Sequence, residues 1–469
     1  MNREHAISVA LAGLEQGEFE ADLARLVAIP TESQNAERAP VLAAYLDREI
    51  RARLERLGFA CRLLPNRVEG PPFLFAERLE DPFATTVLGY GHADVIRGLE
   101  GRWREPASPW ALTRVGDRLY GRGTADNKGQ LAINLGALEA TLQARGGKLG
   151  WNAKFLIEAG EEVGSPGLHE FCADHRQMLA SDVLIASDGP RVDPARSTIF
   201  LGSRGALNFD LRVEPRPSAH HSGNWGGLLS NPAIVLAHAI ACLVGPTGRI
   251  AVPALRPNAI PDDVRAALSS CAVSGGGSDG PAIDAWWGEP GLTAAEKLYG
   301  WNSFEVLAFT AGTPAAPVSA IPGSATARCQ LRFVVDTEGS AILPAVRRAL
   351  DANGFQAVEV RASGDKPFVP TRVPLDNPWV GFVAASIRQT LGQPPTLLPN
   401  LGGSLPNDAF SQILGLPTIW IPHSYANCNQ HAPDEHLLDS IVREGLAIMA
   451  GLYWDLGTSH PRTISAVGS

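Results

Sequence analysis

Apolar residues near the start of the chain recur at spacings of three and four, which is the period of an amphipathic helix. Between residues 5 and 58 this pattern predicts two helices, and Ile29 with the proline after it marks the turn between them. Gly58 is expected to end the second helix, because glycine readily takes the left-handed backbone that follows many helices. The apolar faces consist of Leu23, Leu26, Val27, Leu42, Leu46, Ile50, Leu54 and Leu57.

Beyond residue 80, short apolar runs rich in β-formers alternate with helical segments. The expected strands cover residues 86–90, 153–157 and 182–186, and helices are expected at 130–144 and 168–179. Strands that alternate with helices in this way predict an α/β fold, with a mixed, largely parallel sheet covered by helices.

The pattern changes near residues 188–198, where Pro, Gly and Ser mark a connection. From Leu207 to Val213 apolar and polar residues alternate, which predicts a strand. A His- and Gly-rich loop at 219–227, a helix at 232–243, a Gly/Ser-rich surface segment at 274–280, a strand at 327–335 and a helix at 341–352 follow. After a Pro-rich segment the first pattern resumes, with a helix at 379–391, a strand at 418–421 and a helix at 437–456. The chain is therefore expected to form one α/β domain from residues 1–194 and 373–469, interrupted by an α+β domain at 195–372.

The residue composition and net charge indicate what class of molecule the protein binds. Hydrophobic residues make up 45% of the 469 residues and charged ones 19%, and the formal net charge is −9. A mildly acidic chain without a long Lys/Arg run is not expected to bind nucleic acid or a membrane surface, so a small molecule is favoured. The six cysteines lack CxxC spacing, which favours free thiols in a reducing compartment. No run of about 18 apolar residues occurs, and a cytoplasmic location is expected.

The stretch at 119–130 holds one carboxylate among three glycines, at positions 121, 123 and 129. The glycines allow a tight turn and a close approach to a bound group, while Asp126 offers two oxygens. Two oxygens can bridge two metal ions. The same turn could also be an ordinary helix start with Asp126 as its N-cap.

Two further segments place acidic residues or histidine directly after expected strands. His92 and Asp94 share one face, so the carboxylate can orient the imidazole. Glu161 and Glu162 would project in different directions from an extended backbone, so one can face a metal and the other a water. Each pair also fits a solvated surface, although the apolar strand before Glu161 disfavours that interpretation.

The last two segments are weaker. Asp188 follows the strand at 182–186 in an Asp-Gly pair, which usually forms a turn. A histidine in a loop is more often exposed than bound to a metal, but His431 lies in a loop dense in Asn and Pro and not in a flexible one. His436 is expected to belong to the helix that follows.

Taken in this order, the five segments are specific. His-x-Asp at 92–94, Gly-Arg-Gly-x-x-Asp-x-Lys-Gly at 121–129, Glu-Glu-x-Gly-Ser at 161–165, the Asp at 188 and the His at 431 resemble one family. It is the dinuclear zinc metallopeptidase family of glutamate carboxypeptidase, aminoacylase, acetylornithine and succinyl-diaminopimelate deacylases and carnosinase-type dipeptidases. The resemblance extends from about residue 20 to 456. It implies that 1–194 and 373–469 form the catalytic domain and that 195–372 is a lid and dimerisation domain.

The resemblance also implies a metal site and a mechanism. Two divalent ions per subunit are expected, with zinc the first choice and cobalt or manganese the alternatives, because the ligands offer only nitrogen and oxygen. A bridging water would attack an amide carbonyl while Glu161 takes its proton, and Glu161 would return that proton to the leaving nitrogen. Asp94 would clamp His92. The implied metal ligands are His92, Asp126, Glu162, Asp188 and His431.

Residues outside the metal site complete the resemblance. His221, in a His-Ser-Gly loop, matches a histidine that reaches into the partner subunit's site and polarises the substrate carbonyl. Arg332 matches an arginine that binds the substrate carboxylate. Gly403 and Ser404 resemble a turn that lines the substrate pocket, and Asn302 matches a substrate contact loosely. A homodimer formed through the lid is implied.

The sequence therefore predicts a metal-dependent hydrolase that cleaves the amide bond of small dipeptides or N-acyl amino acids. The length of the inserted segment favours carnosinase-type dipeptidases over the shorter-lid deacylases. One alternative keeps the site but changes the reaction to deamination or aromatic-amide hydrolysis. Trp151, Trp225 and Trp301 would fit an aromatic pocket, although core packing explains them equally well. A non-catalytic binding protein is the other alternative, against which the presence of Glu161 and Asp94 argues.

Overall fold

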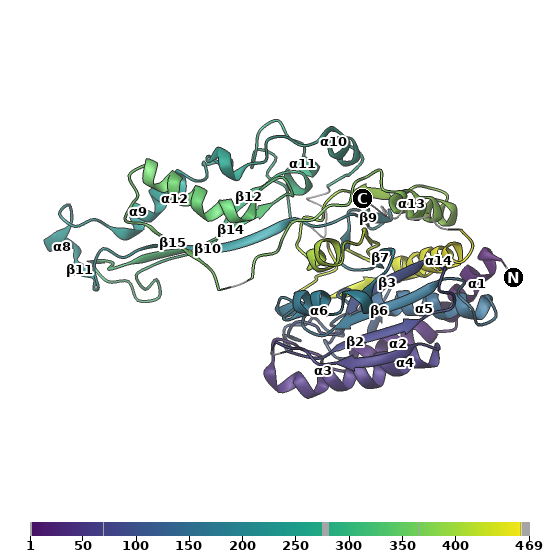
Figure 1. Cartoon of the computed structure of the whole chain (residues 1–469). Coiled ribbons are helices and arrows are strands. Elements are labelled where there is room, and N and C mark those ends of the chain that lie inside the picture. Colours follow the sequence, from purple (N-terminus) through teal and green to yellow (C-terminus); the bar gives the residue numbers. More distant parts are fainter. Residues whose placement is uncertain (1, 69, 274–280, 365, 460, 462–469) are drawn as a thin grey trace.

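A large eight-stranded sheet with helices on both faces forms the body of the molecule, and a narrower sheet projects from it (Figure 1). The computed structural model describes residues 2–68, 70–273, 281–364, 366–459 and 461. Neighbours β6, β3, β7 and β17 run parallel, whereas β1 and β2 are antiparallel to their neighbours. The predicted fold class is confirmed. The strands lie in the order β1 (Ala60–Leu64), β2 (Phe73–Arg78), β6 (Asn152–Glu158), β3 (Thr86–His92), β7 (Val183–Ala186), β17 (Thr418–Trp420), β9 (Thr198–Phe200) and β16 (Thr396–Leu398).

Side chains of the large sheet alternate between two hydrophobic clusters, one on each face. Along β7, Val183 and Ile185 enter the first cluster, and Leu184 and Ala186 enter the second. This alternation follows from the two-residue period of a strand, and burial on both faces explains why the strands are apolar throughout. Helices α1 (Arg3–Glu15), α2 (Glu18–Val27), α3 (Ala39–Tyr45), α4 (Ala52–Arg56), α5 (Lys128–Ala144), α13 (Pro378–Leu391) and α14 (Asp439–Leu456) contribute to the first cluster, and α6 (Leu168–Asp174) and α7 (Arg176–Leu179) to the second.

The amino-terminal helices are more divided than predicted. The first expected helix is split into α1 and α2 at Gly17, whose φ of 79° takes the chain out of the helical path. The second is built from α3, a π-helical stretch at Leu46–Arg51 and α4. Gly58 follows α4 with a φ of 80°, as predicted. The apolar periodicity predicts which face of these helices is buried, but it does not reveal that a helix is interrupted at a glycine.

The projecting sheet has four antiparallel strands in the order β12 (Ser303–Ala311), β14 (Ala325–Phe333), β10 (Gly205–Val213) and β15 (Glu359–Ala362). Helices α9 (Pro232–Ala241) and α12 (Ile342–Ala352) cover one face, where Phe209 and Leu331 are buried. The sequence pattern did not predict β12. Its apolar residues do not alternate with burial, and Val306, Leu307 and Phe309 are all exposed on this edge strand.

Parts of the predicted insertion at 195–372 pack with the large sheet instead of the projecting one. Strand β9 pairs with β16 and β17, and α10 (Asp262–Leu268) and α11 (Ala294–Tyr299) contribute to its second hydrophobic cluster. Because β9 belongs to the large sheet, the first domain boundary would have to lie after β9 instead of after residue 194 for the large sheet to stay within one domain. The division into three parts otherwise stays a prediction. The Gly/Ser-rich segment 274–280 lies outside the described residues.

The far end of the projecting sheet carries β11 (His220–His221), α8 (Ser222–Trp225) and β13 (Ala320–Ile321). Figure 1 places β11 and α8 at the tip, distant from the large sheet. Trp225 and Val318 are exposed in this region. We call residues 205–252 and 302–362 the lid, since they form this projecting unit.

Two further features bear on the environment of the protein. All six cysteines are free thiols, as the sequence predicted. In the part of the chain that the structure describes, no helix combines the length and the apolar character needed to cross a bilayer.

Candidate functional site

The ends of three parallel strands bring three of the predicted site residues, His92, Glu161 and Asp188, to one edge of the large sheet. His92 is the last residue of β3 and is paired with Glu158, the last residue of β6. Glu161 begins a short 3-10 turn just beyond β6, and Asp188 lies two residues beyond β7. Because these strands are parallel neighbours, their carboxyl ends coincide, which is where functional groups of α/β sheets gather.

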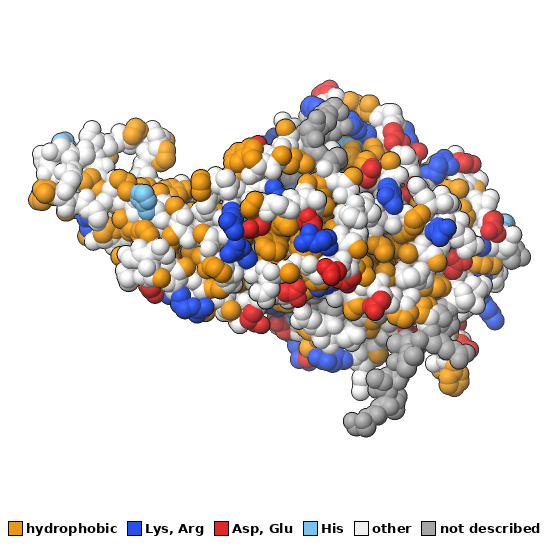
Figure 2. Space-filling model, turned by 90° about the horizontal axis from the view of Figure 1, so that it is seen from above, with side chains coloured by type: hydrophobic (Ala, Val, Ile, Leu, Met, Phe, Trp, Pro, Cys, Tyr) orange, Lys and Arg blue, Asp and Glu red, His pale blue; other side chains and the backbone are white. Residues whose placement is uncertain are grey.

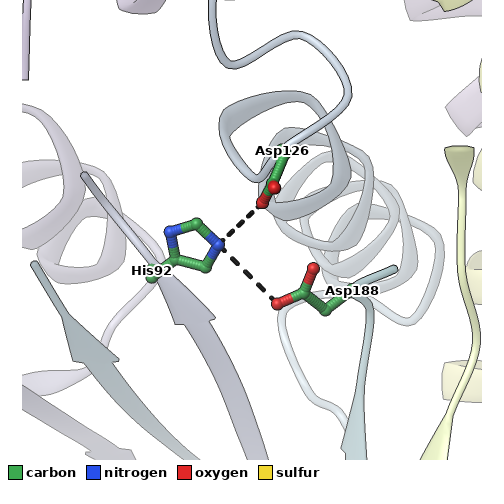
Figure 3. A group of neighbouring side chains, drawn as sticks. All are labelled: His92, Asp126 and Asp188. Atoms are coloured by element: carbon green, nitrogen blue, oxygen red, sulfur yellow. Dashed lines mark hydrogen bonds and ion pairs between the residues drawn. The ribbon is translucent and has the colours of Figure 1, made fainter. Parts of the chain in front are cut away.

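Asp126 lies between two histidines, one toward each carboxylate oxygen. Its Oδ1 is 2.9 Å from Nε2 of His92, and its Oδ2 is 3.2 Å from Nε2 of His431. Nε2 of His92 is also 3.6 Å from Oδ2 of Asp188, so three side chains converge there (Figure 3). On the other side, Nε2 of His431 is 2.9 Å from Oε2 of Glu162. The structure therefore forms two groups of three that share Asp126.

Both groups have the donor set and the spacing of a metal site. In each, the candidate ligand atoms lie within 4.8 Å of one another. Oδ2 of Asp188 is buried and accepts no hydrogen bond from the described residues. Burial, together with the charge of Asp126, raises the pKa of Glu162 to about 7 and that of Asp188 to about 6. Clustered buried carboxylates are costly without a cation, so these residues fit two divalent ions with nitrogen and oxygen ligands.

The same carboxylates raise the pKa values of the two histidines. Hydrogen bonds with Asp126 and Glu162 raise the pKa of His431 to about 10. Burial would lower the pKa of His92, but hydrogen bonds with Asp126 and Asp94 outweigh it and hold that pKa well above its ordinary value. A metal-bound imidazole must be neutral. A cation at either position would therefore replace the positive charge of the protonated histidine in balancing the carboxylates.

Asp94 is fully buried beneath the two groups. Its carboxylate accepts hydrogen bonds from the backbone N–H of Glu161 at 3.2 Å and of Glu162 at 3.1 Å. Its Oδ1 also lies 3.4 Å from Nδ1 of His92. One side chain thus orients a candidate ligand and the turn that carries both glutamates, which agrees with the orienting position predicted for Asp94.

The glycine-rich turn has the strained backbone that its sequence implies. Gly123 has a φ of 85°, and a Cβ at Gly129 would lie 1.9 Å from the carbonyl oxygen of Thr124. Helix α5 begins only at Lys128, and the side chain of Asp126 turns toward the two histidines instead of capping the helix. The glycines are required here because any larger residue would collide with the turn.

Sequence reasoning missed Glu435, which holds this turn in place. The buried Glu435 carboxylate accepts hydrogen bonds from the backbone N–H groups of Gly123, Ala125 and Asp126 at 2.9–3.1 Å, and from Nη1 of Arg122 at 2.7 Å. Nη2 of Arg122 in turn donates to the carbonyl of Ala432, beside His431. The only sequence signal was an acidic residue near His431, and its partners lie about 310 positions earlier.

Two more residues of the same loop differ from expectation or were missed. Gln430 donates from Nε2 to Oδ2 of Asp126, a contact that the sequence did not suggest. His436 was predicted to belong to the last helix, which is wrong. It lies in strand β19 (His436–Leu438), buried, with Nε2 2.6 Å from the hydroxyl of Tyr425.

A cavity of about 730 Å³ opens over the acidic cluster. Asp126, Glu161, Asp188 and His431 line it together with Arg332, Gly403 and Ser404. Arg332 donates from Nη1 to Oγ of Ser404 at 3.1 Å, and that hydroxyl donates to the carbonyl of Arg204 at 2.7 Å. The structure thus brings three of the four predicted substrate-contact residues to the candidate catalytic cluster.

Two predicted residues are not brought to this cluster within one chain. Asn302 is buried in the lid, where its side chain bonds to Leu255, Thr337 and Val334. Asn302 does not line this cavity but a neighbouring one, so its contact with substrate stays a prediction. His221 is exposed at the tip of the lid, far from the large sheet (Figure 1).

The comparison with known families decides the class. Residues 88–455 match the model of peptidase family M20/M25/M40. The chain belongs to this family. The predicted family membership, and with it a hydrolase of the metallopeptidase type, is confirmed. Members use divalent metal ions, in agreement with the two groups around Asp126.

Individual relatives cover most of the chain. It is 26% identical to the human beta-Ala-His dipeptidase over 473 residues, which spans 95% of this chain and 92% of that protein. It is 28% identical to a succinyl-diaminopimelate desuccinylase of Methylobacterium radiotolerans over 320 residues, with 67% and 68% covered. The crystal structure of human carnosine dipeptidase 1 superposes with a TM-score of 0.79 at 23% identity, covering 97% of this chain and 99% of the other, and so shares its fold.

Proposed function

We propose that this M20-family hydrolase cleaves the amide bond of small dipeptides or N-acyl amino acids in the first cavity. The observation that carries the proposal is the position of Asp126 between His92 and His431, with Glu161 on the same cavity wall. A carboxylate shared by two ligand groups, with a second carboxylate free beside it, supports a hydrolytic centre with a separate base.

Two divalent metal ions are proposed at this centre. One would be held by His92 and Asp188 and the other by Glu162 and His431, with Asp126 common to both. Such ions, when bound, supply a Lewis acid for the carbonyl and acidify water. Zinc is the first choice for these nitrogen and oxygen ligands, with cobalt and manganese as alternatives.

Glu161 is proposed as the general base. Burial, reinforced by Asp188 and Asp126, raises the pKa of Glu161 well above its ordinary value, so this carboxylate is basic enough to accept a proton from water. Glu161 would then donate the proton to the leaving nitrogen. Asp94 fixes the position of Glu161 through the backbone hydrogen bond at 3.2 Å.

The part of the first cavity lined by Arg332, Gly403 and Ser404 is proposed to bind the substrate carboxylate. Arg332 presents a guanidinium there, and its hydrogen bond to Ser404 limits its motion. A guanidinium recognises a carboxylate through two parallel hydrogen bonds, which suits a dipeptide or an N-acyl amino acid with a free carboxyl end. Gly403 leaves the adjacent backbone open toward the ligand.

A homodimer formed through the lid is proposed, with His221 acting in the partner's site. Exposed apolar side chains at Val306, Leu307 and Phe309 lie on the open edge of β12, and Figure 2 shows hydrophobic side chains along the projecting arm. An exposed apolar sheet edge is suited to pair with another chain. A second subunit would also explain why His221 lies so far from the cluster of its own chain.

The proposed substrates follow the relatives, which include dipeptidases and a desuccinylase. Trp151 stacks on Tyr453 in the core and Trp225 lies at the lid tip, so neither supports the aromatic-amide alternative. A cytoplasmic location is also proposed, and the free thiols of all six cysteines support it.

Replacement of the base tests the proposal. Glu161→Gln should keep both metals, because its ligand groups are intact, and should lower kcat about 100- to 10,000-fold. Metal content by mass spectrometry and turnover of a panel of dipeptides, N-acyl amino acids and aromatic amides would be measured with zinc, manganese or cobalt added. An unimpaired variant would move the base role elsewhere. Wild-type protein with well under two metals and no amidase activity would refute the proposed function.

A further inference from the structure

A second cavity of about 700 Å³ lies beside the first, between the lid strands and α11. The proposed hydrolysis assigns no role to it. Most of its wall is apolar and includes two tryptophan rings. Its principal apolar side chains are Ile250, Trp287, Leu292, Leu298 and Trp301.

The two cavities meet at a positively charged junction. Arg332 and Leu298 line both spaces. Arg204, which lines the second cavity, carries another guanidinium, buried and fixed by a 3.0 Å hydrogen bond from Nε to the carbonyl of Gly402. A carboxylate bound at Arg332 would therefore sit at the boundary between the two spaces.

Tetrahedral geometry then restricts where the rest of the substrate goes. The α-carbon of a carboxy-terminal residue bears the carboxylate, the scissile amide nitrogen and the side chain, in three different directions. If Arg332 holds the carboxylate and the nitrogen points to Glu161 in the first cavity, the side chain must leave along the third direction. The second cavity opens at the same arginine.

The chemistry of the second cavity favours an apolar occupant. Its walls would strip water from a charged group, which is costly without a partner. The charged side chains of this wall already have partners or face solvent: Glu289 is paired with Arg249 at 3.1 Å, Lys297 donates from Nζ to the carbonyls of Ala285 and Trp287, and Asp284 and Glu305 are exposed. Nε1 of Trp301 is buried and has no hydrogen-bond partner among the described residues.

We infer that the second cavity receives the side chain of the substrate's carboxy-terminal residue and selects a large apolar one. The inference rests on the proposed amide hydrolysis and on the carboxylate-binding role of Arg332. Burial of a leucine or phenylalanine side chain there would strengthen binding only for substrates that carry one, which makes the cavity a determinant of specificity.

The test is the relative kcat/KM of the zinc-loaded protein for Ala-Gly, Ala-Leu, Ala-Phe and Ala-Lys. Ala-Leu and Ala-Phe should be cleaved at least about tenfold more efficiently than Ala-Gly, with Ala-Lys below both. Trp287→Ala removes part of the wall from a side chain that is 43% exposed, so the fold should tolerate it. Its loss of kcat/KM should be about fivefold larger for Ala-Phe than for Ala-Gly.

The matched control is Trp225→Ala, which removes a ring of similar exposure, 45%, at the tip of the lid and outside the cavity wall. It should leave the ratio between the two substrates unchanged. Cleavage of Ala-Gly as fast as Ala-Phe, a preference for Ala-Lys, or equal effects of the two tryptophan variants would overturn the inference while leaving the proposed hydrolysis intact. Absence of cleavage of every dipeptide would instead remove the proposed function on which the inference rests.

Discussion

The edge of the large sheet and the lid differ in how many contacts within one chain hold their functional side chains in place. At the edge, Asp126 is fixed by backbone hydrogen bonds to Glu435 and lies within hydrogen-bond distance of two histidines from distant segments. In the lid, the side chain of Arg332 makes one hydrogen bond to the described residues, to Ser404, and His221 lies exposed at the tip. The edge is thus preorganised within a single chain, whereas the roles proposed for the lid residues depend on substrate or on a second subunit. Changes at the edge should therefore act on metal binding, and changes in the lid on substrate turnover.

The largest effect is expected from Asp126→Ala. Because both ligand groups use this carboxylate, the variant should lose both metals and all activity. His431→Ala should chiefly weaken one position. Metal content per subunit after dialysis would be compared between the two variants, and equal losses in both would contradict a shared role for Asp126.

Next in size is His221→Ala, which should lower kcat about 100- to 1,000-fold if its imidazole stabilises the carbonyl oxygen. Metal content should stay at the wild-type level, since no metal ligand is touched. Mixing this variant with Asp126→Ala subunits should restore part of the activity, because a mixed dimer would combine one intact metal centre with a partner's histidine. No recovery in a mixture shown to contain mixed dimers would place the histidine's action within its own subunit.

A smaller effect is expected from Arg332→Ala. Charge-assisted hydrogen bonds contribute about 1.5–3 kcal/mol, so kcat/KM should fall about 10- to 100-fold for a dipeptide with a free carboxylate. The corresponding dipeptide amide, which lacks that charge, serves as the control and should be almost unaffected. Equal losses for both substrates would remove the carboxylate-binding role.

The smallest effect concerns the support beneath the turn. Glu435→Gln should weaken metal affinity about tenfold, because it disturbs the hydrogen bonds that orient Asp126. The matched control is Glu444→Gln, which also removes the partner of a buried arginine, Arg191, but leaves the turn intact. Competition with a metal chelator would measure affinity, and thermal melting would measure stability. A loss of stability in both variants with unchanged metal affinity in Glu435→Gln would show that Glu435 acts on the fold alone.

Local signals predicted the edge better than the lid. His92, Asp94, Glu161 and Asp188 follow apolar strands, and parallel pairing of those strands brings their ends together whatever the intervening chain does. Glu435 and Gln430 escaped prediction because their partner, the Asp126 turn, is some 300 positions away in the sequence. Asn302 was assigned by a loose local match. Its side chain bonds to Thr337 and Val334 and borders the second cavity, so its contact with substrate stays a prediction.

The lid shows the same limit on a larger scale. Strand β12 lacks alternating burial because its exposed edge carries Val306, Leu307 and Phe309, so the pattern that reveals a half-buried strand is missing. Strand β9 follows the loop after Asp188, yet it pairs with β16, almost 200 residues later. Pairing between distant strands leaves no mark on local periodicity.

By itself, the sequence determined the α/β class, the glycine-rich turn around Asp126 and the set of candidate ligands, because these depend on apolar periodicity and on residue types at fixed local spacing. Tertiary structure alone decided which oxygen of Asp126 faces which histidine, that Glu435 holds the turn, and that a second cavity opens at Arg332. These features arise from contacts between segments that lie 34 to 310 positions apart in the sequence, whose relative positions are set by tertiary packing and not by local residue patterns.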